Sequence, residues 1–134
     1  VDLPQLVEDL HLELDDLFAI TETLELLRFA TVSQGDIQLT TTGRKLAKAD
    51  ILLQKKIFAK QLLAYVPLAK HIRQSLDLEE DHRLDDSLFL KELEQDLSQQ
   101  AAEEVLKVVI EWGRYAEIFA YDSQSGYLSL ENPQ

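Results

Sequence analysis

The chain has 134 residues, 46% of them hydrophobic, which suits one ordinary domain or two very small ones with a buried core. It has no cysteine, which excludes disulfides and thiolate metal sites, and no apolar run approaches the roughly 20 residues of a membrane span. The N-terminus lacks the features of a signal peptide, so we expect a soluble chain, and the absence of methionine even at position 1 suggests a piece of a longer protein.

The net charge of −12 is unevenly distributed along the chain. Residues 1–43 hold nine acids and one base, residues 44–73 hold eight bases and one acid, and residues 74–104 hold eleven acids and two bases. A basic centre therefore lies between two acidic flanks, and it either balances those flanks or binds an acidic partner.

Two helices are expected first, a short one after Pro4 and a second one that begins near Asp15 or Asp16. Apolar residues of the second helix recur at spacings of three and four, which places them on one face. They are Leu17, Ile20, Leu24 and Leu27. Alternating apolar residues from Phe29 to Thr40, around a turn that contains Gly35, then predict a β-hairpin.

Three helices are expected in the centre of the chain. Thr40 or Thr41 can cap a helix that starts near Gly43, and Asp50 can cap a helix from Ile51 to about Val66. Pro67 then starts a helix to about Leu76. The polar stretch 77–87 is interpreted as a solvated loop.

The C-terminal part repeats the order of the N-terminal part. RFATVSQGDIQL at 28–39 resembles RYAEIFAYDSQSGYLSL at 114–130, so that Arg114 corresponds to Arg28 and Tyr115 to Phe29. In each copy the aromatic residue and the following branched residue, Val32 or Ile118, are expected to seal a hairpin onto its helix. The helix before the second copy should bury one face made of Ala101, Val105, Val108, Trp112 and Tyr115.

The pattern predicts a mainly α fold with small β-hairpins (α+β), made of tandem winged-helix modules joined by central helices. The expected divisions are a first winged helix over 1–43, a basic helical connector over 44–66 and a second winged helix over 67–134.

The sequence offers little material for catalysis or for metal binding. None of the four glycines falls in a phosphate-binding loop, so no cofactor is expected in this chain. His82 among nearby acids could form a cation site, but a solvated acidic loop is the favoured interpretation. Asp15 and Asp16 are interpreted as helix-start charges rather than an acid/base pair, which leaves a small acidic-site enzyme as the weakest hypothesis.

A winged helix could also bind DNA as a transcription regulator. The two expected recognition helices, 15–28 and 99–114, are net negative and would be repelled by phosphates, so no nucleic-acid partner is expected. The basic centre is the remaining candidate surface. Its candidate partner-binding residues are Arg44, Lys45, Lys48, Lys55, Lys56 and Lys60, with Lys70 and Arg73 further along.

Four strings together resemble a known family. They are TETLELLRFATVSQGDIQLTTTGRKLAKADI at 21–51, KKIFAKQLL at 55–63, VPL at 66–68 and IEWGRYAEIFAYD at 110–122. The chain is similar to the AAA-associated C-terminal domain that follows the ATPase module of ABC transporters in the nitrate, sulfonate and taurine import group. Members usually have another helix before the stretch that begins at Val1, so the first module is expected to lack its first helix.

The resemblance implies a non-catalytic appendage in the cytoplasm, peripheral to the inner membrane through the transporter complex. Its expected partners are the ATPase module, the dimer mate of that module or the permease, with no direct membrane insertion. ATP and Mg would bind the upstream ATPase module.

Overall fold

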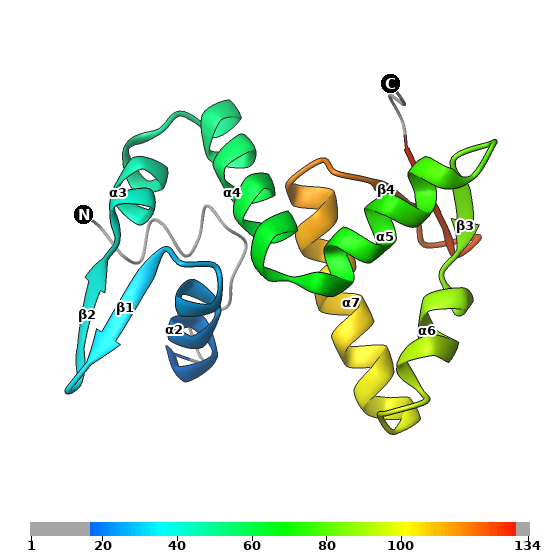
Figure 1. The fold of residues 1–134 in the computed structure, drawn as a ribbon, viewed down its shortest axis with the longest axis horizontal. Coiled ribbons are helices and arrows are strands. Elements are labelled where there is room, and N and C mark those ends of the chain that lie inside the picture. Colours follow the sequence, from blue (N-terminus) through cyan, green and yellow to red (C-terminus); the bar gives the residue numbers. More distant parts are fainter. Residues whose placement is uncertain (1–16, 131–134) are drawn as a thin grey trace. The chain divides into compact units, whose positions relative to one another are not determined.

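The computed structural model describes residues 17–130 of the chain, and their side chains from residue 22 onward (Figure 1). The helix expected after Pro4 and the helix start at Asp15 or Asp16 lie outside these residues. The described part is mainly helical, with six helices and two small antiparallel sheets, as the sequence predicts. Contacts divide the chain into two compact units, Val1–Gln61 and Leu62–Gln134. The division into 1–43, 44–66 and 67–134 stays a prediction.

The described part of unit 1 contains the second expected helix, the first hairpin and most of the two central helices over 41–65. Its described elements are α2 (Leu17–Leu26), β1 (Ala30–Ser33), β2 (Asp36–Leu39), α3 (Thr41–Lys48) and α4 (Ile51–Tyr65), whose last four residues belong to unit 2. The predicted helix, hairpin and two following helices are confirmed in this order.

The end of α2 fixes the path of the chain into the hairpin. Arg28 adopts the left-handed conformation (φ 64°), and the N–H groups of Arg28 and Phe29 donate to the carbonyl oxygens of Glu25 (3.0 Å) and Leu24 (2.8 Å). This is the Schellman pattern of helix termination. It turns Phe29 inward, where the side chain is fully buried and stacks on Phe58 with ring centroids 6.2 Å apart.

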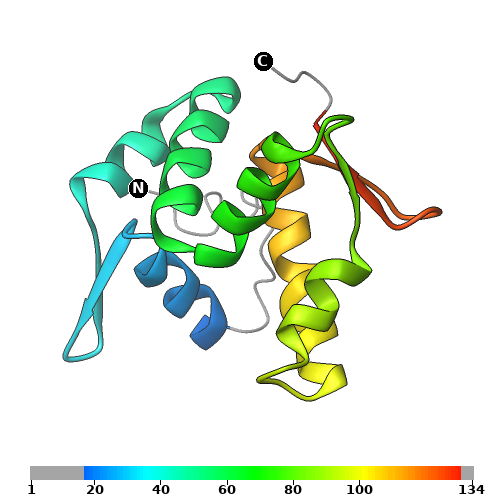
Figure 2. The same ribbon diagram turned by 45° about the vertical axis from the view of Figure 1, so that its right-hand side comes forward.

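The hairpin pairs Ala30 with Leu39 and Ser33 with Asp36 across a two-residue turn. Positive φ angles at Gln34 (51°) and Gly35 (84°) match the type I′ geometry that suits a twisted hairpin. The expectation that Val32 seals the hairpin is wrong, since its side chain is 40% exposed. The cause is that the hairpin projects beyond α2, so none of the described helices packs on its outer half (Figure 2).

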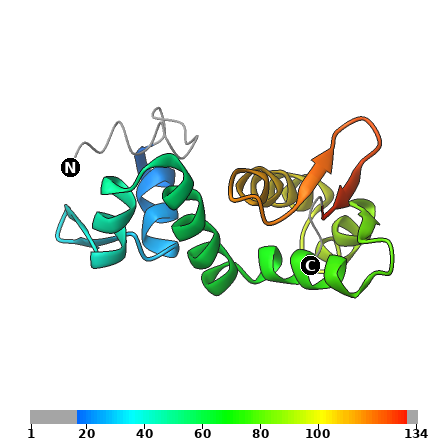
Figure 3. The same ribbon diagram turned by 90° about the horizontal axis from the view of Figure 1, so that it is seen from above.

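Unit 2 combines three helices with a three-stranded antiparallel sheet. Its elements are α5 (Pro67–Leu78), β3 (Arg83–Asp85), α6 (Ser87–Leu93), α7 (Gln99–Tyr115), β4 (Ala120–Asp122) and β5 (Tyr127–Ser129), and the order of the strands is β3-β5-β4. The turn between β4 and β5 projects from the unit (Figure 3). The interpretation of 77–87 as a loop is wrong in part: α5 continues to Leu78, and β3 pairs Leu84 with the buried Leu128.

The face that α7 buries is one residue away from the predicted face. Val105 (41%) and Val108 (40%) are exposed, so the prediction for them is wrong. The buried residues are Ala102, Leu106, Val109, Ile110 and Gly113, with Tyr115 at the helix end. Both series are apolar, so periodicity cannot choose between them. The ring of Phe119 packs so closely on Gly113 that a Cβ there would clash, and this contact favours the observed face.

The C-terminal ends of α2 and α7 have similar backbone geometry. The structural correspondence between them differs by three residues from the one predicted by comparing the two sequence segments. At the end of α7, Glu117 is the left-handed residue (φ 60°), and the N–H of Ile118 donates to the carbonyl oxygen of Gly113 (3.0 Å). Arg28 therefore corresponds to Glu117 rather than to Arg114, and Phe29 corresponds to Ile118 rather than to Tyr115. The shared feature is the terminating backbone geometry.

Replacing Phe29 tests whether this helix end holds unit 1 together. Phe29→Ala should lower the free energy of unfolding by about 3 to 5 kcal/mol, because the ring is fully buried against Phe58. Val32→Ala in the same strand should cost less than about 1 kcal/mol. Both values come from denaturant unfolding, and equal losses in the two variants would contradict the inward role of Phe29.

Candidate functional site

The six candidate partner-binding residues all lie in unit 1, on two helices rather than on one. Arg44, Lys45 and Lys48 belong to α3, whereas Lys55, Lys56 and Lys60 belong to α4. We call these six residues the basic surface. Five of them are exposed and Lys55 is half-buried. Lys70 and Arg73 lie in α5 of unit 2, so the basic centre of the sequence is divided between the two units.

Close backbone packing fixes the position of α3. The hydroxyl of Thr40 accepts from the N–H of Gly43 (3.0 Å) and donates to the carbonyl oxygen of Arg28 (2.6 Å), so it ties the start of α3 to the end of α2. A Cβ at Gly43 would clash with the carbonyl of Phe29, which explains the glycine. Because Gly43 and Leu46 face the core, the three basic residues of α3 remain exposed.

Buried glutamines fix the position of α4. Gln54 (4% exposed) donates from Nε2 to the carbonyl oxygen of Leu46 (3.1 Å), at the last turn of α3. Gln61 (9% exposed) donates to the carbonyl oxygen of Leu27 (2.9 Å), just after α2. The bond to Leu27 satisfies a carbonyl just after α2, and the bond to Leu46 adds to the one that the Leu46 carbonyl accepts from the N–H of Ala49 (3.3 Å). Sequence reasoning missed both residues, although they share the spacing of Phe58 on the same face.

The basic surface carries a strong local charge. Residues 44–60 contain six bases and one acid, a net charge of +5 in a chain of −12. That acid is Asp50, whose carboxylate accepts from the N–H of Leu53 (2.9 Å) and so caps α4, as predicted. In general, a local excess of positive charge attracts acidic groups.

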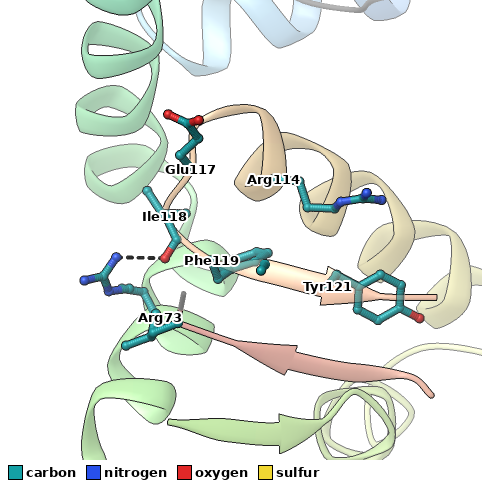
Figure 4. A pocket seen from close by; sticks show the side chains of 8 residues that line it. Arg73, Arg114, Glu117, Ile118, Phe119 and Tyr121 are labelled. Atoms are coloured by element: carbon teal, nitrogen blue, oxygen red, sulfur yellow. Dashed lines mark hydrogen bonds between the residues drawn. The ribbon is translucent and has the colours of Figure 1, made fainter. Parts of the chain in front are cut away.

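Unit 2 contains a cavity of about 460 Å³ beside β4 (Figure 4). The guanidinium groups of Arg73 and Arg114 point away from each other, so they do not converge on one anion (Figure 4). Arg73 donates to the carbonyl oxygen of Ile118 (2.8 Å), and its Nε lies 3.5 Å from Oδ1 of Asp77. It therefore holds the chain that follows α7 against α5. The lining residues are Arg73, Arg114, Glu117, Ile118, Phe119, Ala120, Tyr121 and Leu130.

Comparison with known families decides the affiliation of the chain. Residues 4–122 match the family described as the C-terminal AAA-associated domain. The chain belongs to this family. Comparison with curated proteins and with solved structures gave no match. As a C-terminal AAA-associated domain, the chain is an accessory domain of an ATPase, and the resemblance drawn from its four strings is confirmed at the level of the family.

The described part of this AAA-associated domain offers no site for a metal ion. Between residues 17 and 130, no three His, Asp or Glu side chains form a group that could hold one. The ring nitrogen Nδ1 of His82 lies 2.9 Å from the carbonyl oxygen of Leu76, and Leu130 donates to the backbone oxygen of His82 (3.1 Å). His82 thus joins the end of α5 to the end of β5. None of the described helices has the length and apolarity to cross a membrane.

The hydroxyl of Tyr121 connects β4 to the start of α6. It donates to Oδ2 of Asp86 (2.8 Å), whose backbone N–H donates to the carbonyl oxygen of Gly126 (2.8 Å). The hydrogen bond to Asp86 is the largest cause of a raised pKa at Tyr121, and partial burial of the hydroxyl is the second cause. Asp86, Tyr121 and Gly126 therefore form a link that holds the projecting turn.

A titration of Tyr121 tests this link. The raised pKa means that the folded state favours the neutral phenol of Tyr121. The contribution of this hydrogen bond to the stability of the fold is therefore fully present below the unfolded pKa of about 10, and it is lost as the pH rises through the folded pKa. Asp86→Ala should lower the pKa of Tyr121, whereas Asp96→Ala should leave it unchanged. The pKa is measured by NMR from the chemical shift of the ring carbon Cζ, which carries the hydroxyl. An unaltered titration in Asp86→Ala would contradict the link.

Proposed function

We propose that this chain is a non-catalytic accessory domain of an ABC transporter ATP-binding subunit. The subunit would serve import of nitrate, sulfonate or a similar small anion, and the domain would act in the cytoplasm, peripheral to the inner membrane. The match of residues 4–122 to the C-terminal AAA-associated domain carries the proposal. Catalysis, with its ATP and Mg, would belong to an ATPase module upstream.

We also propose that the domain is built from two winged-helix modules. The order of elements in unit 2 supports this, since helix, strand, helix, helix, strand and strand follow one another and the last strand lies in the middle of the sheet. A projecting turn between the last two strands is a wing. In unit 1, the helix and hairpin from α2 to β2 would form the corresponding part of the first module.

The proposed contact is between the basic surface and an acidic surface of the ATPase module, its dimer mate or the permease. The local charge of +5 supports it, because the rest of the chain is acidic and the six side chains lie on two helices fixed by buried hydrogen bonds. Because the backbone of these helices is already fixed, binding a partner costs little backbone conformational entropy.

Charge reversal on α4 tests this contact. Lys55→Glu with Lys56→Glu should weaken association of the domain with the ATPase–permease complex by at least about tenfold and impair uptake, because it places like charges at the interface. The wild-type association should also weaken as salt rises. Co-purification at low and high salt, together with uptake assays, measures both effects.

The matched control reverses two exposed lysines of unit 2, Lys70 and Lys91, and so changes the net charge equally. It should leave association close to the wild-type value. Unchanged association and uptake in the α4 variant would refute the proposed contact.

A transcription regulator that binds DNA is the second candidate function, and the order of elements in unit 2 favours it. The charge of the helix that would enter the groove opposes it. On α7 the acids Glu103, Glu104 and Glu111 are all exposed, against Lys107 and Arg114. Phosphates would repel such a helix.

We therefore expect no sub-micromolar binding of duplex DNA at physiological salt. Fluorescence anisotropy with mixed-sequence duplexes checks this, because phosphate neutralisation supplies most non-specific affinity. Tight binding with a sequence preference would favour the transcription regulator over the transporter domain.

A further inference from the structure

The first turn of α4 exposes three apolar side chains in a row. Ile51 is 53% exposed, Leu52 69% and Leu53 48%. Single exposed leucines are common on protein surfaces, but runs of three exposed apolar residues are unusual unless they have a function. We call these three residues the apolar tip.

The packing of α4 explains why the apolar tip is exposed. Gln54 and Phe58 form the side of the helix that faces the core, and Asp50 caps its start. Three consecutive helical residues point in directions about 100° apart, so together they span more than half of the circumference of the helix. A partner that touches one side of α4 would leave part of the apolar tip in water. Only a contact made end-on covers all three side chains.

Basic residues surround the apolar tip in the sequence and on the two helices. Lys48 ends α3 three residues before it, and Lys55 and Lys56 follow it within the next turn of α4. The turn from α3 to α4 joins these elements (Figure 1). From residue 37 to residue 76 the single acid is Asp50, whose carboxylate is engaged by the N–H of Leu53.

We infer that the apolar tip and the basic surface bind an anionic lipid surface. The side chains of Ile51, Leu52 and Leu53 enter the boundary between head groups and acyl chains, and the flanking Lys48, Lys55 and Lys56 remain at the level of the phosphates. A fluid interface closes around a helix end from all sides, whereas a protein groove would need to enclose it. This contact differs in kind from a spanning segment, since α4 has only 15 residues.

This inference goes beyond the proposed function and does not depend on it, because it concerns the chain and lipid alone. It also departs from the sequence-based expectation of no direct membrane insertion. The exposure of Leu52 is the new observation.

A vesicle-binding experiment with the 134-residue chain tests the inference. Flotation with vesicles of phosphatidylcholine that contain about 30% phosphatidylglycerol should show binding, and pure phosphatidylcholine vesicles should bind at least about tenfold more weakly. Leu52→Ser should lower binding to the anionic vesicles by about tenfold, because a leucine side chain no longer enters the interface. Lys55→Glu with Lys56→Glu should lower it further.

Leu78 provides the matched control, since it is 87% exposed and lies in α5 of unit 2. Leu78→Ser should bind as the wild type does. In a second measurement, Leu52→Trp should show tryptophan emission at shorter wavelength on addition of anionic vesicles, and Leu78→Trp should not. Circular dichroism of every variant checks that the chain remains folded.

Three results would overturn the inference. They are absence of binding to anionic vesicles, equal binding to neutral vesicles, and equal losses in Leu52→Ser and Leu78→Ser. If vesicles do not bind the chain but Leu52→Ser weakens association with the ATPase–permease complex, the apolar tip is a protein contact and the lipid proposal is wrong. The proposed function would stand in that case.

Discussion

The position of Phe29 is the constraint on which unit 1 depends. Its N–H donates to the carbonyl oxygen at the end of α2, its own carbonyl oxygen accepts from the N–H of Thr40 (3.0 Å), and its ring stacks on Phe58 of α4. The close approach of Gly43 adds α3 to the same point. One residue therefore connects three helices and the hairpin through backbone as well as ring. Because a left-handed residue at Arg28 directs the chain there, a local helix end sets the tertiary arrangement of the unit.

This arrangement explains why the basic residues of α3 and α4 point away from the core. The inward sides of α3 and α4 are occupied by Gly43, Leu46, Gln54 and Phe58, and Gln54 makes a buried polar contact between the two helices. The lysines of these helices are exposed, apart from the half-buried Lys55, and exposed ion pairs contribute only about 0 to 1 kcal/mol each to stability. The same packing leaves the first turn of α4 with three exposed apolar side chains.

Much of the fold could be predicted from the sequence, because strong local signals mark it. Thr40 and Asp50 are caps, Pro67 starts a helix, and Gly35 permits a tight turn; each acts through its own backbone neighbours. Strand β3 could not be predicted, since its pairing partner lies more than forty residues away. The buried face of α7 could not be chosen between two apolar series without knowledge of Phe119. For the candidate site, the lysines were visible as a charge cluster, but the buried glutamines and the exposure of Leu52 depend on packing between helices.

We propose that the domain meets its surroundings through the basic surface and the apolar tip of unit 1. Amide hydrogen exchange of the full-length protein, alone and assembled with its transporter in membranes, tests it most directly. Assembly should slow exchange chiefly in residues 44–60, with little change in α7. Slower exchange in α7 together with unchanged exchange in 44–60 would contradict it, because the contact would then lie on the other unit.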